Sequence, residues 1–428
     1  MATIHSLLAD IRETSLSQWG KGNRFERLMQ AYMRADPMFV ERFSEVWLWS
    51  EWPGNDGKGD TGIDLVAQER DREGCCAIQC KFYAPDQLLQ KQDIDSFFTA
   101  SGKAPFASRL IISTTDRWGK NAEDALEQQQ IPVTRIGLAE IEQSPVCWEF
   151  VWPAASDVEI NLGVAAKHEL RKHQTAALEE VFGGFEAHSR GKLIMACGTG
   201  KTFTALKLAE RLAAERGRHT SVLFLVPSIS LLSQALREWT AQCETPLRCF
   251  AVCSDTKVGK RSVSEDIRLH DLAFPATTDP QRLLEQVKRA KQGARLTVVF
   301  STYQSIATIA DAQQGGLPEF DLAICDEAHR TTGVTLAGED ESHFVRIHDQ
   351  AYIKATKRLY MTATPRLFDD STKSSAAENA AVLCSMDDEA LYGPEFHRLG
   401  FGEAVEQRLL TDYKVLILTV DESYLAHS

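Results

Sequence analysis

An apolar run that leads through a glycine-rich turn into a helical pattern constrains the fold of this 428-residue chain more than any other feature. Apolar segment 192–196 is followed by Cys197-Gly198-Thr199-Gly200-Lys201-Thr202 and then by TFTALKLAERLAAER, which has helical spacing. In such a strand-to-helix turn, backbone N–H groups face a phosphate, a lysine reaches its outer oxygens and a threonine hydroxyl binds Mg²⁺. Met195 stands where the full motif has its first glycine, so the strict motif is not met and the turn keeps only its Gly-x-Gly-Lys-Thr part. We therefore expect a nucleotide site at Gly198, Thr199, Gly200, Lys201 and Thr202.

The residues around this turn predict a parallel sheet covered by helices on both faces. Short apolar runs (KLIMA, SVLFLV, LTVVFST, FDLAICD and RLYMTA) alternate with helical stretches, which is typical of such a sheet. The run 322–325 ends in Asp326-Glu327-Ala328-His329. Because the carboxyl ends of parallel strands meet at one edge, we expect Asp326 to hold Mg²⁺ and Glu327 to polarise an attacking water.

Together with Met361-Thr362-Ala363-Thr364-Pro365, these segments resemble motifs I, II and III of superfamily 2 helicases and translocases. The resemblance implies a RecA-like domain that binds ATP. It also makes Leu170-Arg171-Lys172-His173-Gln174 the adenine-reading segment, with Arg171 and Gln174 as base contacts. Segments 226–228 and 301–304 match the places where such motors touch a nucleic-acid backbone. For Tyr303, a packed aromatic side chain and a DNA contact remain equal alternatives.

Motors of this family close a second RecA-like lobe over the nucleotide, and that lobe supplies an arginine finger. In this sequence only the run 413–420 resembles the start of such a lobe, and no arginine can be assigned as the finger. We therefore expect weak nucleotide turnover by this chain, as in a fragment, a shortened gene or one subunit of a larger enzyme.

The first 150 residues predict a separate small α/β domain. A helical pattern containing Phe25 and Glu26 precedes two strand-like runs, IDLVAQ and AIQCKFY, which are joined by the polar turn ERDREG. Side chains alternate along a strand, so Gln79 and Lys81 share one face. Phosphodiester cleavage with Mg²⁺ needs a carboxylate, a second oxygen ligand and a nearby cation, and Asp64, Gln79 and Lys81 fit these roles. Glu26 is a further candidate carboxylate in the same site.

These segments (GxxFE, GxGIDLVA and QxK) resemble the Mrr-like branch of the PD-(D/E)xK nucleases. Most of the wider fold carries Asp or Glu where this chain has Gln79, whereas Gln is the expected residue in the Mrr branch. Asp60 is a rival to Asp64 as the metal ligand, although a glycine-flanked aspartate is more often a turn former. Trp47, Trp49 and Trp52 are expected to pack beneath the site rather than to stack on bases.

Composition and spacing divide and classify the chain. We expect a restriction-endonuclease-like α/β domain at 1–150, a linker at 151–165, a RecA-like P-loop domain at 166–370, and a connection with the beginning of a second lobe at 371–428.

The net charge of −13 argues against a protein that coats DNA passively. The ten cysteines form no CxxC pair, so reduced core thiols are expected rather than a zinc site. Without a long apolar run or a leader pattern, we expect a cytoplasmic protein with no membrane partner.

A nuclease placed ahead of such a motor resembles the N-terminal half of single-chain type ISP restriction-modification enzymes. The resemblance implies double-stranded DNA as partner, ATP and Mg²⁺ as cofactors, and methyltransferase and target-recognition parts that are not in these residues. Two other functions remain open: a catalytically silent nuclease fold that anchors a nucleotide-gated scaffold on DNA, and an RNA-remodelling helicase. The nuclease-like domain argues against the RNA alternative.

Overall fold

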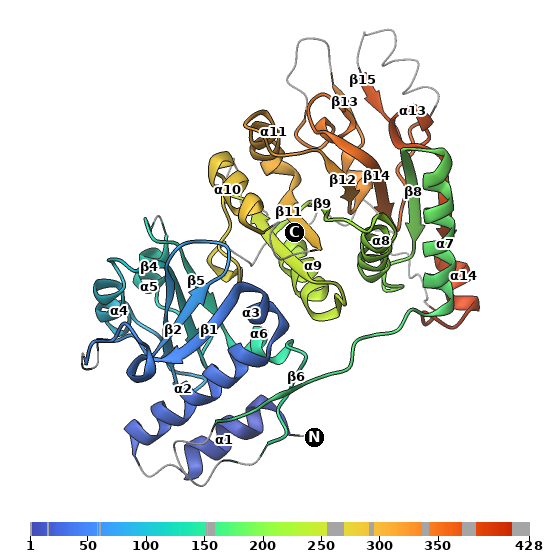
Figure 1. Cartoon of the computed structure of the whole chain (residues 1–428). Helices are drawn as coiled ribbons and strands as arrows, with labels where there is room; N and C mark the ends of the chain where they lie inside the picture. The colour runs from blue at the N-terminus through green and yellow to red at the C-terminus, as the bar shows by residue number, and fades with distance from the viewer. Residues whose placement is uncertain are drawn as a thin grey trace, which may run out of the picture.

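Two β-sheets, each in its own part of the chain, organise the fold (Figure 1). The computed structural model describes residues 2–14, 17–57, 59, 61–127, 129–150, 152, 159–254, 269–290, 295–335, 342–369 and 382–412. Within these ranges, no helix is both long and apolar enough to cross a membrane.

The first sheet has five strands in sequential order, with helices packed around them. Strand β2 is antiparallel to both β1 and β3, whereas β4 and β5 run parallel to β3. Helix α2 begins at an N-cap serine, Ser17, and buries the predicted apolar face that includes Phe25 and Tyr32 against this sheet. The elements are β1 (Phe43–Leu48), β2 (Leu65–Glu69), β3 (Cys75–Lys81), β4 (Phe106–Ser113), β5 (Val133–Ile136), α1 (Ile4–Thr14), α2 (Gln18–Ala35), α3 (Pro37–Arg42), α4 (Asp95–Ala100), α5 (Lys120–Leu126) and α6 (Leu138–Glu142).

The second sheet has seven parallel strands in the order β10-β11-β9-β12-β14-β8-β16, and the predicted parallel sheet is confirmed. All five apolar runs that predicted strands lie in it. The elements are α7 (Lys172–Ala187), β8 (Arg190–Met195), α8 (Lys201–Arg216), β9 (Thr220–Val226), α9 (Ile229–Gln242), β10 (Leu247–Val252), α10 (Pro280–Ala290), β11 (Leu296–Thr302), α11 (Ile306–Gln314), β12 (Phe320–Cys325), β14 (Ala355–Thr362), α13 (Glu389–Tyr392), β16 (Glu395–Leu399) and α14 (Phe401–Glu406).

The segment expected to begin a second lobe is described at 382–412. Its strand β15 (Val382–Cys384) pairs with β13 (Gly333–Thr335) in a separate two-stranded sheet, whereas its strand β16 joins the seven-stranded sheet. Strand β16 pairs with β8, and Leu399 accepts a hydrogen bond from the Ala196 N–H at 3.0 Å. The predicted strand at 413–420 lies outside the described residues. In the expected linker, β7 (Gly163–Val164) pairs with β6 (Val146–Cys147), and an extended segment then leads to α7 (Figure 1). The domain boundaries stay predictions.

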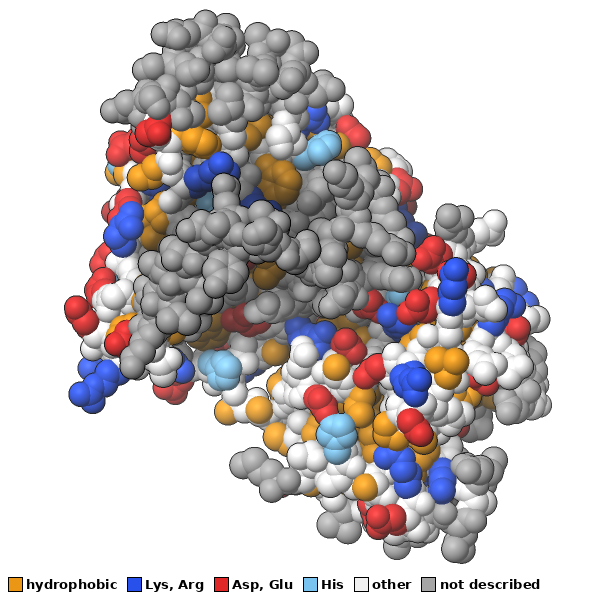
Figure 2. Space-filling view, turned by 180° about the vertical axis from the view of Figure 1, so that it is seen from behind, with side chains coloured by type: hydrophobic (Ala, Val, Ile, Leu, Met, Phe, Trp, Pro, Cys, Tyr) orange, Lys and Arg blue, Asp and Glu red, His pale blue; other side chains and the backbone are white. Residues whose placement is uncertain are grey.

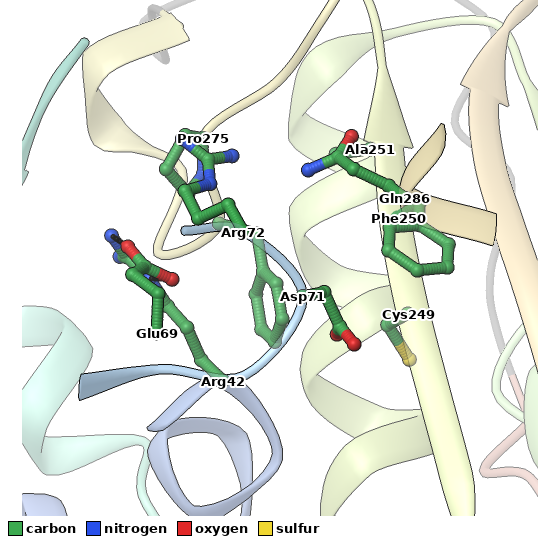
Figure 3. A pocket seen from close by; sticks show the side chains of 10 residues that line it. Arg42, Glu69, Asp71, Arg72, Cys249, Phe250, Ala251, Pro275 and Gln286 are labelled. Carbon is green, nitrogen blue, oxygen red and sulfur yellow. Dashed lines mark hydrogen bonds and ion pairs between the residues drawn. The ribbon is translucent and has the colours of Figure 1, made fainter. Parts of the chain in front are cut away.

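The two sheet-containing units meet where α3 packs against α9 and approaches β10. Glu41 accepts a hydrogen bond from the Cys249 N–H at 2.7 Å, and Arg42 donates to the Ala273 carbonyl at 2.5 Å. Figure 3 shows side chains from both units around a cavity of about 20 Å³ at this junction, which has room for about one water molecule.

Figure 2 shows acidic and basic side chains interspersed over the described surface of one face, without a dominant basic patch there.

Candidate functional site

The glycine-rich turn lies between β8 and α8, and two of its glycines have conformations that other residues rarely adopt. Gly198 has a φ of 81° and Gly200 a φ of 87°. A Cβ atom on Gly200 would lie 2.3 Å from Nε2 of Gln174, so the backbone angle favours glycine and a side chain there would displace the Gln174 amide from the turn. The turn leads into the N-terminus of the 16-residue helix α8, where backbone N–H groups and the helix dipole favour an anion.

The segment that resembles the adenine-reading motif packs directly on this turn. The carbonyl of Thr199 accepts hydrogen bonds from Nε2 of His173 at 2.9 Å and from Nε2 of Gln174 at 3.2 Å. The Oε1 atom of Gln174 accepts from the Arg171 N–H at 2.9 Å, while the Arg171 residue is exposed. An amide has a second donor hydrogen and a second lone pair, so Gln174 retains the capacity to pair with a base edge.

Lys201 and Thr202 begin helix α8, and both make contacts around the turn. The Nζ atom of Lys201 donates to the Met195 carbonyl at 3.2 Å, so the ammonium lies against the turn. The Thr202 carbonyl accepts from Nε1 of Trp239 at 3.2 Å. Helix α9, which carries Trp239, therefore packs on the first turn of α8 and fixes it from the side.

Asp326 follows β12 and is 7% exposed. Burial first, and then the charge of Glu327, raise the pKa of Asp326 to about 6, while the Glu327 backbone N–H and the Lys201 charge lower it. The Oδ1 atom of Asp326 is buried without a hydrogen-bond partner among the described residues. An unsatisfied carboxylate oxygen within electrostatic range of Lys201, in the glycine-rich turn, fits a hard cation such as Mg²⁺.

The residues after Asp326 connect the acidic motif to the segment 361–365. Glu327 has a φ of 47°, a left-handed conformation that is uncommon for a glutamate. The Nδ1 atom of His329 lies 3.3 Å from Oε2 of Glu327 and 3.1 Å from Oγ1 of Thr362. Tyr303 is fully buried, and its hydroxyl donates to the Asp326 carbonyl at 2.9 Å. The packing interpretation of Tyr303 is therefore confirmed.

In the first unit, the hairpin of β2 and β3 brings the predicted nuclease residues together. The Asp64 N–H donates to the Ile78 carbonyl at 2.9 Å, and Oδ2 of Asp64 accepts from the Cys80 N–H at 2.6 Å. Gln79 is 2% exposed, and its Nε2 donates to the Gly62 carbonyl at 3.0 Å. In the part of the chain that the structure describes, Oε1 of Gln79 has no hydrogen-bond partner.

The pKa of Cys80 responds to three charged residues of the predicted site, which therefore lie within electrostatic range of its thiol. Burial raises the pKa of the Cys80 thiol; the carboxylates of Asp64 and Glu26 raise it further and the Lys81 ammonium lowers it. Glu26 belongs to helix α2. The described residues hold no group of three or more His, Cys, Asp or Glu suited to a metal. A cation here would therefore use two carboxylates, the Gln79 amide oxygen and water, a donor set that suits Mg²⁺. Asp60 lies outside the described residues.

The tryptophans near this hairpin pack on one another and on the core. Trp49 and Trp52 are stacked with ring centroids 5.5 Å apart, and Trp52 lies 5.7 Å from Phe106. Trp47 packs against the same apolar cluster. The three indoles are half-buried and make these packing contacts, while their place beneath the site stays a prediction.

The sequence reasoning missed two residues on helices, one near the acidic motif and one that contacts the glycine-rich turn. Glu238, on α9, has a pKa raised by burial and by the charge of Asp326, so it lies near the acidic motif. The sequence around Glu238 indicates only an amphipathic helix and gives no sign that this residue lies near the acidic motif. His173, in contrast, lies next to Gln174 in a segment that was already identified, and this adjacency could have suggested its contact with the turn.

Comparisons with known proteins match two separate parts of the chain. Residues 34–158 match a restriction endonuclease family, and residues 167–367 match the family of the res subunit of type III restriction enzymes. The endonuclease subunit of the Escherichia coli type I restriction enzyme EcoAI is 26% identical over 256 residues, which are 59% of this chain and 24% of that protein.

Among solved structures, the ATP-dependent type ISP restriction-modification enzyme LlaBIII bound to DNA is 38% identical. The match has a TM-score of 0.82 and covers 97% of this chain and 26% of that enzyme. This chain thus spans about a quarter of the length of each of these relatives. It combines a restriction endonuclease domain with a helicase-type domain, and in structure it closely matches the type ISP restriction-modification enzymes.

Proposed function

We propose that this chain takes part in ATP-dependent DNA restriction, in which Mg²⁺-dependent cleavage of double-stranded DNA is coupled to an ATP-driven superfamily 2 translocase. The names of the relatives support this proposal, since one is an ATP-dependent restriction-modification enzyme bound to DNA and another is an endonuclease subunit. Methyltransferase and target-recognition parts are proposed as partners beyond these 428 residues.

For cleavage, we assign Asp64 and the Gln79 amide oxygen as Mg²⁺ ligands, with Glu26 as an additional carboxylate. Lys81 stabilises the charge that develops on the phosphate or orients the attacking water. The observation that carries this assignment is the oxygen of Gln79, which is buried without a hydrogen-bond partner in the described residues and belongs to the same face of β3 as Lys81. A buried oxygen without a partner costs about 1–3 kcal/mol, and a bound cation would remove that cost.

For ATP hydrolysis, we assign the backbone of Gly198, Thr199 and Gly200 to the phosphates, together with Lys201. The Thr202 hydroxyl and Asp326 hold Mg²⁺, and Glu327 orients the attacking water. Arg171 and Gln174 contact the adenine. The partnerless oxygen of Asp326 within the described part of the chain supports this second cation site.

Plasmid nicking tests the nuclease. The 428-residue chain is incubated with supercoiled plasmid and Mg²⁺ or Mn²⁺, and we expect Lys81→Ala to lower the nicking rate at least 100-fold. Lys103→Ala is the matched control, because Lys103 is exposed on the same domain. If wild-type protein binds duplex DNA but nicks it at no metal concentration, the result favours the DNA-anchoring alternative. Equal nicking by Lys81→Ala contradicts the residue assignment.

Nucleotide binding tests the motor. We expect Lys201→Ala to remove binding of a fluorescent ATP analogue, because the turn then loses the cation that faces the outer phosphates. Wild-type hydrolysis is then measured with duplex DNA and with RNA. Stimulation by DNA supports the proposal, whereas stimulation by RNA alone favours the RNA-remodelling alternative.

A further inference from the structure

A buried group of aromatic and histidine side chains lies at the far end of the acidic motif, outside every segment assigned above. The Thr331 carbonyl accepts hydrogen bonds from the Tyr392 hydroxyl at 2.9 Å and from Nε2 of His348 at 3.2 Å. The Tyr360 hydroxyl lies 3.0 Å from Nδ1 of His348. Ring centroids lie 4.6 Å apart for His348 and Tyr392, and 4.8 Å apart for Tyr360 and Tyr392. We call Thr331, His348, Tyr360 and Tyr392 the tyrosine–histidine cluster.

The protons of this cluster can be assigned without conflict. Burial lowers the pKa of His348 to about 4, so the imidazole is neutral at pH 7 and carries one ring proton. If Nε2 holds that proton, it donates to the Thr331 carbonyl, and Nδ1 accepts from the Tyr360 hydroxyl. The Tyr392 hydroxyl fills the second lone pair of the same carbonyl, and Oγ1 of Thr331 donates to the Ala328 carbonyl at 2.7 Å. Each donor in this scheme has one acceptor, which is the condition for a rigid buried network.

The cluster forms one of two anchors on the acidic motif. At the motif's beginning, the Tyr303 hydroxyl holds the Asp326 carbonyl, and at its end the cluster holds the Thr331 carbonyl. Between the anchors lie Glu327, with its left-handed backbone, and His329, which contacts Thr362. A left-handed conformation in a glutamate costs of the order of 1 kcal/mol and persists only where the surroundings impose it. Two anchors on either side can impose it.

We propose that Tyr392, acting together with His348 on the Thr331 carbonyl, is a positioning residue that holds Glu327 and His329 in the geometry needed for ATP hydrolysis. The inference rests on the proposed ATPase activity. It assigns a role to the segment of α13, which lies after the last motif of the helicase resemblance. Because the cluster contacts the protein backbone and not the nucleotide site, its loss changes the hydrolysis rate and leaves ATP affinity nearly unchanged.

The test compares Tyr392→Phe, which removes one hydroxyl and keeps the ring, with wild type as the full 428-residue chain. We expect hydrolysis of Mg·ATP under single-turnover conditions to fall about tenfold, with the affinity for a fluorescent ATP analogue changed less than twofold. Hydrogen exchange of the peptide 326–332 is expected to become about tenfold faster. Tyr352→Phe is the control, because the Tyr352 hydroxyl accepts from Arg346 at 3.1 Å in the same lobe but outside the cluster.

Unchanged hydrolysis, or unchanged exchange of 326–332, overturns the inference, and so does equal loss in Tyr352→Phe. A wild-type chain that does not bind Mg·ATP refutes the proposed function instead, and hydrogen exchange still tests the anchor in that case. Tyr360→Phe disturbs the same cluster at a different residue, so it separates the proposed effect from a folding defect caused only by the change at residue 392. It removes the donor to His348, and we expect a smaller loss of the same kind, about threefold.

Discussion

Gln79 and Asp326 each bury an oxygen that finds no partner among the described residues, a property that Thr61 beside Gln79 shares. The sequence predicted both residues, because each stands at a strand position that a known type of site requires. Glu238 and Tyr392 could not be predicted in the same way. Each is a single polar residue on a helix, and its neighbours come from distant segments that only the folded chain brings together.

Gln79→Glu tests the amide oxygen as a metal ligand. A second full negative charge next to Asp64 strengthens attraction to a divalent cation, so we expect Mn²⁺ to bind roughly tenfold more tightly, or about 1.4 kcal/mol. Without metal, the added buried charge is expected to lower the unfolding temperature, because two neighbouring carboxylates repel each other. Calorimetric titration with Mn²⁺ measures the affinity. Gln92→Glu, an exposed change in the same domain, is expected to leave it unaltered. Equal affinity in Gln79→Glu and wild type contradicts the assignment.

At the scale of elements, apolar runs predicted the strands well, but they did not predict strand order. The polar sequence EFHRL of β16 carries no strand signal, and its place beside β8 depends on a crossover through α13 and the preceding residues. The hairpin of β2 and β3 was predicted correctly because its turn is local. Local geometry is therefore readable from the sequence, whereas pairing between distant segments is decided by packing of whole elements.

The glycine-rich turn gives a prediction at this scale. Gly200→Ala places a Cβ 2.3 Å from Nε2 of Gln174 on a backbone with φ 87°, so we expect loss of ATP-analogue binding and a destabilisation of about 1–3 kcal/mol. Gly217→Ala is a matched control at the other end of α8. Gly217 has a φ of 62° with nothing within 4 Å of a Cβ, so only the backbone cost of about 1 kcal/mol is expected there. Loss of binding in both variants would mean that the helix, and not the turn, is responsible.

At the scale of the whole molecule, the junction between the two units could not be predicted. Glu41 and Cys249 are 208 positions apart in the sequence, and the residue pattern of neither segment indicates a contact with the other unit. The contact nevertheless gives a backbone N–H group of the edge strand β10 a hydrogen-bond acceptor, and it buries the carboxyl group of Glu41. Ion pairs such as Arg135 with Asp271, 2.5 Å apart, add to the same junction. Specific polar contacts thus hold the first unit against the β10 edge of the seven-stranded sheet.

Glu41 makes this junction sensitive to pH. Burial first, and then the charge of Asp71, raise the pKa of Glu41 from 4.5 to about 8, against the opposing effects of Arg248, the Cys249 N–H and Arg70. The folded chain therefore holds the Glu41 proton more tightly than the unfolded chain does. Its contribution to the free energy of unfolding is present below about pH 4.5 and is lost as pH rises toward 8.

Glu41→Gln keeps an oxygen that accepts from the Cys249 N–H and removes the ionisation. Between pH 6 and pH 9, we expect wild type to lose roughly 2 kcal/mol of stability that the variant retains, because ionised Glu41 must be desolvated beside Asp71. Denaturant unfolding of the full chain at both pH values measures the difference. Glu45→Gln, an exposed change on the adjoining strand β1, is expected to track wild type. If Glu41→Gln loses as much stability as wild type over this range, ionisation of Glu41 does not control the junction.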